Sequence, residues 1–153
     1  MSRAFVKELE DGVEELPERP ISPHPNLVTA EGLAHIEAEV TRLQQEHAAA
    51  HAANDRTALS RATRDLRYWT ARRATAQPVA APSDRSKVHF GSTVTVVRND
   101  GRRQTFRIVG EDEVDPARGT LSHASPLARA LFGKELGDTV KVAQSEAEIV
   151  EIA

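Results

Sequence analysis

The hydrophobic residues of this chain change their spacing once, near residue 80, and this change limits what the chain can fold into. Before it, large apolar residues recur at steps of three and four, the spacing of one helix face. After it, apolar and polar residues alternate, the spacing of a strand with one buried face. Residues 78–86, which carry two prolines and no period, separate the two parts. The sequence therefore predicts a helical part and a β-rich part joined by a linker.

The helical part covers residues 29–77, with Thr29 as a candidate cap. Two apolar seams run through it: Leu33, Ile36, Val40 and Leu43, then Leu59, Ala62, Leu66, Trp69 and Arg73. Residues 54–57, Asn-Asp-Arg-Thr, form the best break, because these polar residues favour helix caps. Two amphipathic helices with a short break predict an antiparallel coiled-coil hairpin. Its first helix has at most about 24 residues, or roughly 36 Å.

Several hairpin side chains have two readings. Arginines of the second helix form a basic side, which we interpret as a solvated face: Arg61, Arg64, Arg67, Arg72 and Arg73. Trp69 and Tyr68 are expected to pack at the hairpin base. His47 and His51 are four residues apart, a spacing that can hold zinc, but no third ligand is evident.

Residues 1–28 form an acidic segment that ends in prolines at positions 17, 20, 23 and 25. Proline fixes φ and removes an amide donor, so this segment cannot be one long helix. Its apolar residues offer a means of docking on a neighbour: Phe5, Val6, Leu9, Val13 and Leu16. Low hydrophobicity and high charge favour a flexible tail.

The β-rich part covers residues 87–153. Asn99-Asp100-Gly101 is a strong hairpin turn between two alternating runs. Ser125 and Pro126 mark a helix start, and Gly133 closes that short helix. Residues 139–142 and 147–152 are the last predicted strands. The fold class is therefore α+β: a helical hairpin followed by an antiparallel sheet with one short helix.

Composition excludes several classes. The chain has no cysteine, which rules out disulfides and thiol catalysis. A net charge of −3 gives no global reason to bind nucleic acid. No apolar run reaches the ~18–20 residues that span a bilayer, so we expect a cytoplasmic protein without membrane contact. No nucleophile–base pair, phosphate loop or complete metal set is evident, so we expect no enzyme activity.

Three stretches of the β-rich part resemble the C-terminal domain of the Gre transcription elongation factors: residues 88–96, 106–115 and 121–140. The most specific is Ser-Pro-Leu-Ala-Arg-Ala-Leu at 125–131, followed by Gly-Lys-Glu-Leu-Gly-Asp at 133–138. The resemblance implies a fold like that of FK506-binding proteins, without isomerase activity. It also implies an N-terminal coiled-coil hairpin, which the apolar spacing predicts independently.

The resemblance also implies a partner, RNA polymerase. In this family the globular domain grips the rim of the polymerase secondary channel and the hairpin enters it. The docking loop would comprise Ser122, Ser125, Pro126, Leu127 and Arg129. The same loop is also an ordinary helix start. No sequence-specific nucleic-acid contact is implied, and the oligomeric state is not predicted.

The hairpin tip departs from the family pattern. Family members carry acidic tip residues that help hold a catalytic Mg²⁺, so that the polymerase cleaves backtracked RNA. Here the tip is Asn54, Asp55 and Arg56, and Ala58 stands where the family has Glu. Asp55 is the one candidate for a Mg²⁺ shared with the polymerase; its other reading is a helix cap. We therefore expect polymerase binding with weak or absent cleavage stimulation, and no cofactor of the chain's own.

Two alternatives stay open at this point. A short hairpin is also typical of the regulator of nucleoside diphosphate kinase, a Gre relative, and the chain could instead be a binding module for another enzyme. Within the β-rich part, the acidic run at 111–115 is either a solvated turn or a site for a metal or a basic partner.

Overall fold

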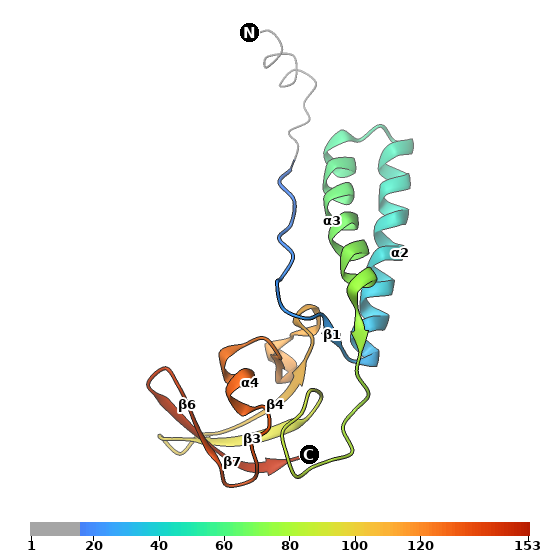
Figure 1. The fold of residues 1–153 in the computed structure, drawn as a ribbon. Helices are drawn as coiled ribbons and strands as arrows, with labels where there is room; N and C mark the ends of the chain where they lie inside the picture. Colours follow the sequence, from blue (N-terminus) through green and yellow to red (C-terminus); the bar gives the residue numbers. More distant parts are fainter. Residues whose placement is uncertain (1–15) are drawn as a thin grey trace. The chain divides into compact units, whose positions relative to one another are not determined.

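The computed structural model describes residues 16–153 and divides the chain into two compact units (Figure 1). One unit contains Ala34–Thr75 and the segment that ends at Pro23. The other contains His24–Leu33 and Ala76–Ala153. The flexible tail expected for residues 1–15 lies outside the described residues. The remainder of that segment is divided between the two units, so residues 24–28 belong with the β-rich part.

The predicted hairpin is confirmed. Helix α2 spans Ala30–Ala52 and helix α3 spans Arg56–Thr75. Thr29 caps α2, because its side-chain oxygen accepts a hydrogen bond from the Gly32 amide at 3.0 Å. The 23 residues of α2 give a length of about 35 Å. Buried seam residues fill the space between the helices: Ile36, Val40, Leu43, Ala50 and Ala62.

The end of the second seam differs from the prediction. Arg72 is buried, with 2% of its surface exposed, whereas Arg73 is exposed. Arg72 is therefore not part of the solvated basic face that the sequence suggests. Trp69 packs edge-on against Tyr68 and His35, with ring centroids 5.2 Å and 5.4 Å away. The expected aromatic packing at this position of the hairpin is present.

A strap formed by residues 16–19 packs along α3. The Arg19 guanidinium lies 4.0 Å from the ring centroid of Tyr68 and 3.5 Å from the Asp65 carboxylate. Glu18 pairs with Arg67, the residue that precedes Tyr68. A cation above an aromatic ring contributes about 0.5–1 kcal/mol where the site is exposed. The strap thus has specific contacts on α3, although its sequence reads as part of a flexible tail.

The β-rich unit contains two sheets. In the small one, β1 (Leu27–Val28) pairs in parallel with β2 (Gln77–Pro78). In the larger one the strand order is β5-β4-β3-β7-β6. These strands are β3 (Thr93–Arg98), β4 (Arg103–Val109), β5 (Thr120–Ser122), β6 (Thr139–Val142) and β7 (Ser145–Ile152). Neighbours are antiparallel except β4 and β5, which are parallel. The sheet is therefore mixed at one edge, where the sequence predicted an antiparallel sheet.

The predicted turn and short helix are both present. Gly101 adopts φ 85°, which a side chain would strain, and closes the β3–β4 hairpin. Helix α4 spans Pro126–Leu131. Two short 3₁₀ turns, η1 (Glu111–Glu113) and η2 (Pro116–Arg118), precede it. The core lies between α4 and the sheet and includes Leu131, Ile108 and Ile149, each 0% exposed. Burial of each such side chain contributes about 1.5–3 kcal/mol.

Glu113 links the 3₁₀ turn η1 to the start of α2. Its carboxylate accepts hydrogen bonds from the Thr29 amide at 2.9 Å, from the Gly110 amide at 3.0 Å and from the Thr29 hydroxyl. All of these residues belong to the β-rich unit. The acidic run is therefore more than a solvated turn, since one of its carboxylates fixes the first turn of a helix far away in the sequence. The position of this carboxylate also explains why residue 32 is a glycine, because a Cβ there would lie 2.1 Å from the Glu113 carboxyl carbon.

A second carboxylate, that of Asp84, makes local hydrogen bonds in the segment before β3. Asp84 accepts hydrogen bonds from the Ser86 hydroxyl at 2.5 Å and from the Ser86 amide at 2.8 Å. Its other oxygen lies 3.0 Å from Nε2 of His89. These donors, the Ser86 hydroxyl first, hold the pKa of Asp84 well below its usual value.

We predict that Gly32→Ala destabilises the chain, although Gly→Ala inside a helix ordinarily stabilises by about 0.5–1 kcal/mol. The new methyl group displaces the Glu113 carboxylate from its donors. The loss of these hydrogen bonds should lower the free energy of unfolding by about 1–3 kcal/mol, measured by urea unfolding.

The matched test places Gly32→Ala in a Glu113→Ala background. There the methyl group meets no carboxylate, so the substitution should become neutral or stabilising. If Gly32→Ala has the same destabilising effect in both backgrounds, the Glu113 contact does not determine the choice of glycine.

For Asp84 we predict a carboxyl titration midpoint below the ordinary value of about 3.9. Since the folded pKa is lowered, the interaction stabilises above the ordinary pKa and is lost as pH falls through the folded pKa. Ser86→Ala should raise the midpoint, whereas Ser83→Ala should leave it unchanged. Carbon-detected NMR titration measures all three; an equal midpoint in Ser86→Ala would contradict the assignment.

Candidate functional site

The loop that leads from β5 into α4 is held by its own serine side chains. The Ser122 hydroxyl accepts a hydrogen bond from the Ala124 amide at 3.1 Å. The Ser125 hydroxyl accepts one from the Ala128 amide at 3.2 Å and so caps α4, with Pro126 in the first turn. Both hydroxyls therefore have a local structural task, and each retains lone-pair capacity for a further contact.

Exposure separates the predicted docking residues into two groups. Pro126 and Arg129 are exposed, whereas Leu127 is buried in the core at 8%. Ser122 and Ser125 are half-buried. Leu127 therefore anchors α4 from below, and the exposed surface of the short helix is formed by Pro126 and Arg129.

Two features near this helix in sequence were not anticipated. His123 is buried, with 6% exposed, and its ring packs against Phe90 at 5.6 Å between centroids. Leu136 is 63% exposed in the turn that follows α4. The turn itself is fixed, because the Glu135 amide donates to the Asp138 carboxylate at 2.8 Å. An exposed leucine on a fixed turn is available for an apolar contact, and the glycines around it gave a turn signal but no sign of a binding residue.

At the hairpin tip, Asp55 acts as a helix cap. Its carboxylate accepts a hydrogen bond from the Ala58 amide at 3.1 Å, and Asn54 adopts the left-handed conformation at φ 53°. Asn54, Asp55 and Arg56 are all exposed. Among residues 16–153, no group of three or more His, Asp or Glu side chains is arranged to hold a metal ion. This applies equally to His47 and His51 on α2.

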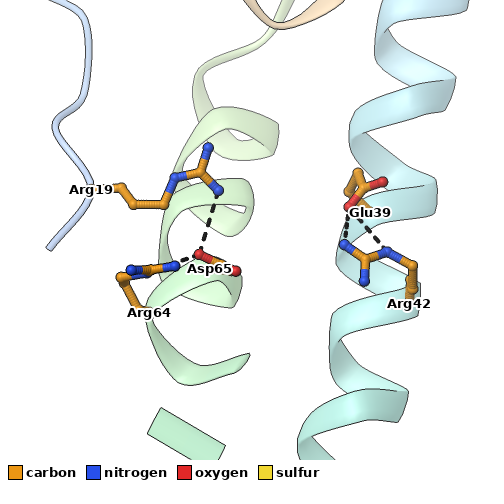
Figure 2. A network of polar contacts seen from close by, with 5 residues as sticks. All are labelled: Arg19, Glu39, Arg42, Arg64 and Asp65. Carbon is orange, nitrogen blue, oxygen red and sulfur yellow. Dashed lines mark hydrogen bonds and ion pairs between the residues drawn. The ribbon is translucent and has the colours of Figure 1, made fainter. Parts of the chain in front are cut away.

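Ion pairs between residues of the hairpin unit neutralise part of its surface charge (Figure 2). Arg64 and Arg19 both contact the Asp65 carboxylate, with nitrogen–oxygen distances of 3.0 Å and 3.5 Å. On α2, Arg42 contacts Glu39 at 2.5 Å. Exposed pairs of this kind contribute little to stability, about 0–1 kcal/mol each. Asp65 thus offsets part of the arginine charge on α3, and Glu39 does the same for Arg42 on α2.

No helix within the described part of the chain is long and apolar enough to cross a membrane. The sequence matches the family model "Transcription elongation factor, GreA/GreB, C-term" over residues 82–153. This match covers the linker end, the larger sheet and α4.

Individual relatives extend the likeness to the hairpin. A transcription elongation factor GreA of Legionella pneumophila (strain Lens) is 33% identical over 159 residues, covering 86% of this chain and 97% of the relative. GreA of Alkalilimnicola ehrlichii is 50% identical over 78 residues, but the match covers only 48% of this chain and 49% of that relative.

A solved GreA/GreB structure from Nitrosomonas europaea is 19% identical, with a TM-score of 0.42 and coverage of 83% of this chain and 98% of that one. The family assignment rests on the sequence matches. The Legionella relative is aligned over nearly its whole length, and the conspicuous Ser-Pro helix start lies within the matched C-terminal domain. The chain belongs to the GreA/GreB family of transcription elongation factors.

Proposed function

We propose that this protein binds RNA polymerase in the cytoplasm and regulates transcription elongation without being an enzyme itself. The observation that supports this most directly is the match of residues 82–153 to the GreA/GreB C-terminal domain, together with the rigid, exposed start of α4. The comparisons give no support to the alternative, a regulator of nucleoside diphosphate kinase.

The docking surface we propose is centred on Pro126 and Arg129. Both side chains are exposed on a helix that Leu127 and Leu131 anchor in the core. A site on an anchored helix loses little conformational entropy on binding, since its geometry is already fixed. Arg129 supplies charge for an acidic partner surface, and Pro126 supplies a rigid apolar contact. By resemblance to the family, we place the partner surface at the rim of the polymerase secondary channel.

Stimulation of transcript cleavage is not part of this proposal. A shared Mg²⁺ needs several oxygen ligands in octahedral geometry. The tip offers one carboxylate, and Asp55 already uses one of its oxygens as a helix cap. Arg56 adds positive charge next to it, and Ala58 contributes no ligand. A channel ligand with this tip competes with other ligands for the polymerase instead of assisting its chemistry.

The first test changes the docking helix. Arg129→Glu should weaken binding to core RNA polymerase by about tenfold or more, because central arginines are among the interface residues whose loss costs most and tenfold corresponds to about 1.4 kcal/mol. Arg103→Glu is the matched control, since it makes the same charge change on an exposed residue of β4. Its affinity should change by less than about twofold, as expected for a charge outside an interface.

Fluorescence anisotropy of the labelled chain against core polymerase gives both affinities. Equal weakening in the two variants would indicate a general charge effect and would contradict a local docking site. Absence of binding by the unmodified chain would overturn the proposed function.

The second test concerns cleavage. Stalled elongation complexes with Mg²⁺ and this protein should release short 3′ RNA fragments no faster than polymerase alone. In the same complexes, the protein should inhibit cleavage stimulated by a GreA relative. Release of fragments that Asp55→Ala abolishes would show instead that the single tip carboxylate is sufficient.

A further inference from the structure

The turn that precedes α4 has one side chain that points into the protein. This docking turn comprises residues 122–125, in which the Ser125 amide donates to the Ser122 carbonyl at 3.0 Å and the Ala124 amide donates to the Ser122 hydroxyl at 3.1 Å. His123, its second residue, is only 6% exposed. Since protein interiors are close-packed, whatever lies against His123 influences the shape of this turn.

A second turn lies against it, formed by residues 89–92. The Ser92 amide donates to the His89 carbonyl at 3.0 Å, and the Ser92 hydroxyl accepts from the His89 amide at 2.9 Å. Its third residue, Gly91, has φ 87°, which favours glycine. The Gly91 amide donates to the Ile108 carbonyl at 2.8 Å, and the Ile108 amide donates to the Ser92 carbonyl at 3.0 Å. This support turn is therefore fixed to strand β4.

Phe90 and His123 join the two turns. Phe90 is the second residue of the support turn, as His123 is of the docking turn, and it is 7% exposed. The two rings lie edge to face, with 5.6 Å between centroids and 73° between planes, a favourable arrangement of aromatic rings. Both side chains are buried, so a partner protein does not reach them. Their contact fixes the docking turn on the support turn.

The docking turn in its turn fixes the start of α4. Ser125 is the last residue of the turn and also the N-cap of the helix. Its hydroxyl accepts from the Ala128 amide at 3.2 Å, and its carbonyl accepts from the Arg129 amide at 3.0 Å. The backbone of Arg129 is thus bonded to the turn that rests on Phe90.

We propose that Phe90 and His123 are positioning residues for the docking surface of Pro126 and Arg129. This inference rests on the proposed function, since it concerns the same surface. The polymerase contacts the two exposed side chains, whereas the buried aromatic pair determines where those side chains lie. A change in the pair should therefore lower the affinity for polymerase without removing any residue of the docking surface.

The first measurement needs no polymerase. Phe90→Leu keeps an apolar side chain but removes the ring contact, so amide hydrogen exchange at Ala124 and Ala128 should become at least about tenfold faster relative to the core amide of Ile149. The matched control is Phe106→Leu, the same substitution at a partly buried phenylalanine of β4 that packs on the core. It should leave this ratio unchanged. NMR measures the exchange, and urea unfolding gives the overall stability of both variants.

The second measurement uses core RNA polymerase and the labelled full chain. Phe90→Leu should weaken binding by about threefold or more, within the range for residues that act on a site without touching the ligand. Phe106→Leu should change the affinity by less than about twofold, as expected for an independent site. When added to Arg129→Glu, Phe90→Leu should cost less affinity than it does alone, because the residue that it positions is already lost.

Three results would overturn the inference: unchanged exchange at Ala124 in Phe90→Leu, equal loss of affinity in Phe90→Leu and Phe106→Leu, or full additivity of Phe90→Leu with Arg129→Glu. A purely structural role gives the last two. Absence of binding by the unmodified chain would instead overturn the proposed function, and the exchange measurement distinguishes this failure from a failure of the aromatic pair to fix the turn.

Discussion

The carboxylate of Glu113 is the interaction on which the arrangement of the β-rich unit most depends. Three donors from two distant segments converge on it: the amide and hydroxyl of Thr29 and the amide of Gly110. A part-buried carboxylate needs such donors, since desolvation without them is costly. The contact fixes the first turn of α2 within the β-rich unit and leaves no space for a side chain at position 32.

Polar side chains also satisfy local backbone amides at the two places where the family resemblance suggests function. Ser125 caps α4, and Asp55 caps α3. At the α4 loop this local role suits the docking surface that we propose, because a fixed helix start presents Pro126 and Arg129 in one geometry. At the tip it works against metal binding, because the one carboxylate is partly used and no second one accompanies it. In the function that we propose, the same kind of helix cap is thus compatible with docking at α4 and unfavourable for a metal site at the tip.

Much of the fold follows from local sequence signals. The change of hydrophobic period, the Asn-Asp-Gly turn and the Ser-Pro helix start each depend on neighbouring residues, so the sequence displays them directly. Long-range choices are different. Nothing near Thr120 indicates a parallel partner for β5, and nothing near Glu113 indicates a bond to Thr29, 84 residues away. The spacing of apolar residues also defines the buried face of a helix only approximately. At the end of α3 the spacing indicates Arg73, whereas Arg72 is the side chain that turns inward.

The composition of residues 16–19 does not indicate the contacts that this segment makes with α3. Prolines and charges in this segment are typical of a flexible tail, because such residues cannot build a core of their own. Helix α3 supplies what the segment lacks: Tyr68 and Asp65 for Arg19, and Arg67 for Glu18. The hairpin gains in return, since its alanine-rich seam near the tip buries little surface. The ion pairs and the cation–π contact of residues 16–19 therefore add stabilising contacts to a hairpin whose own seam contains small residues.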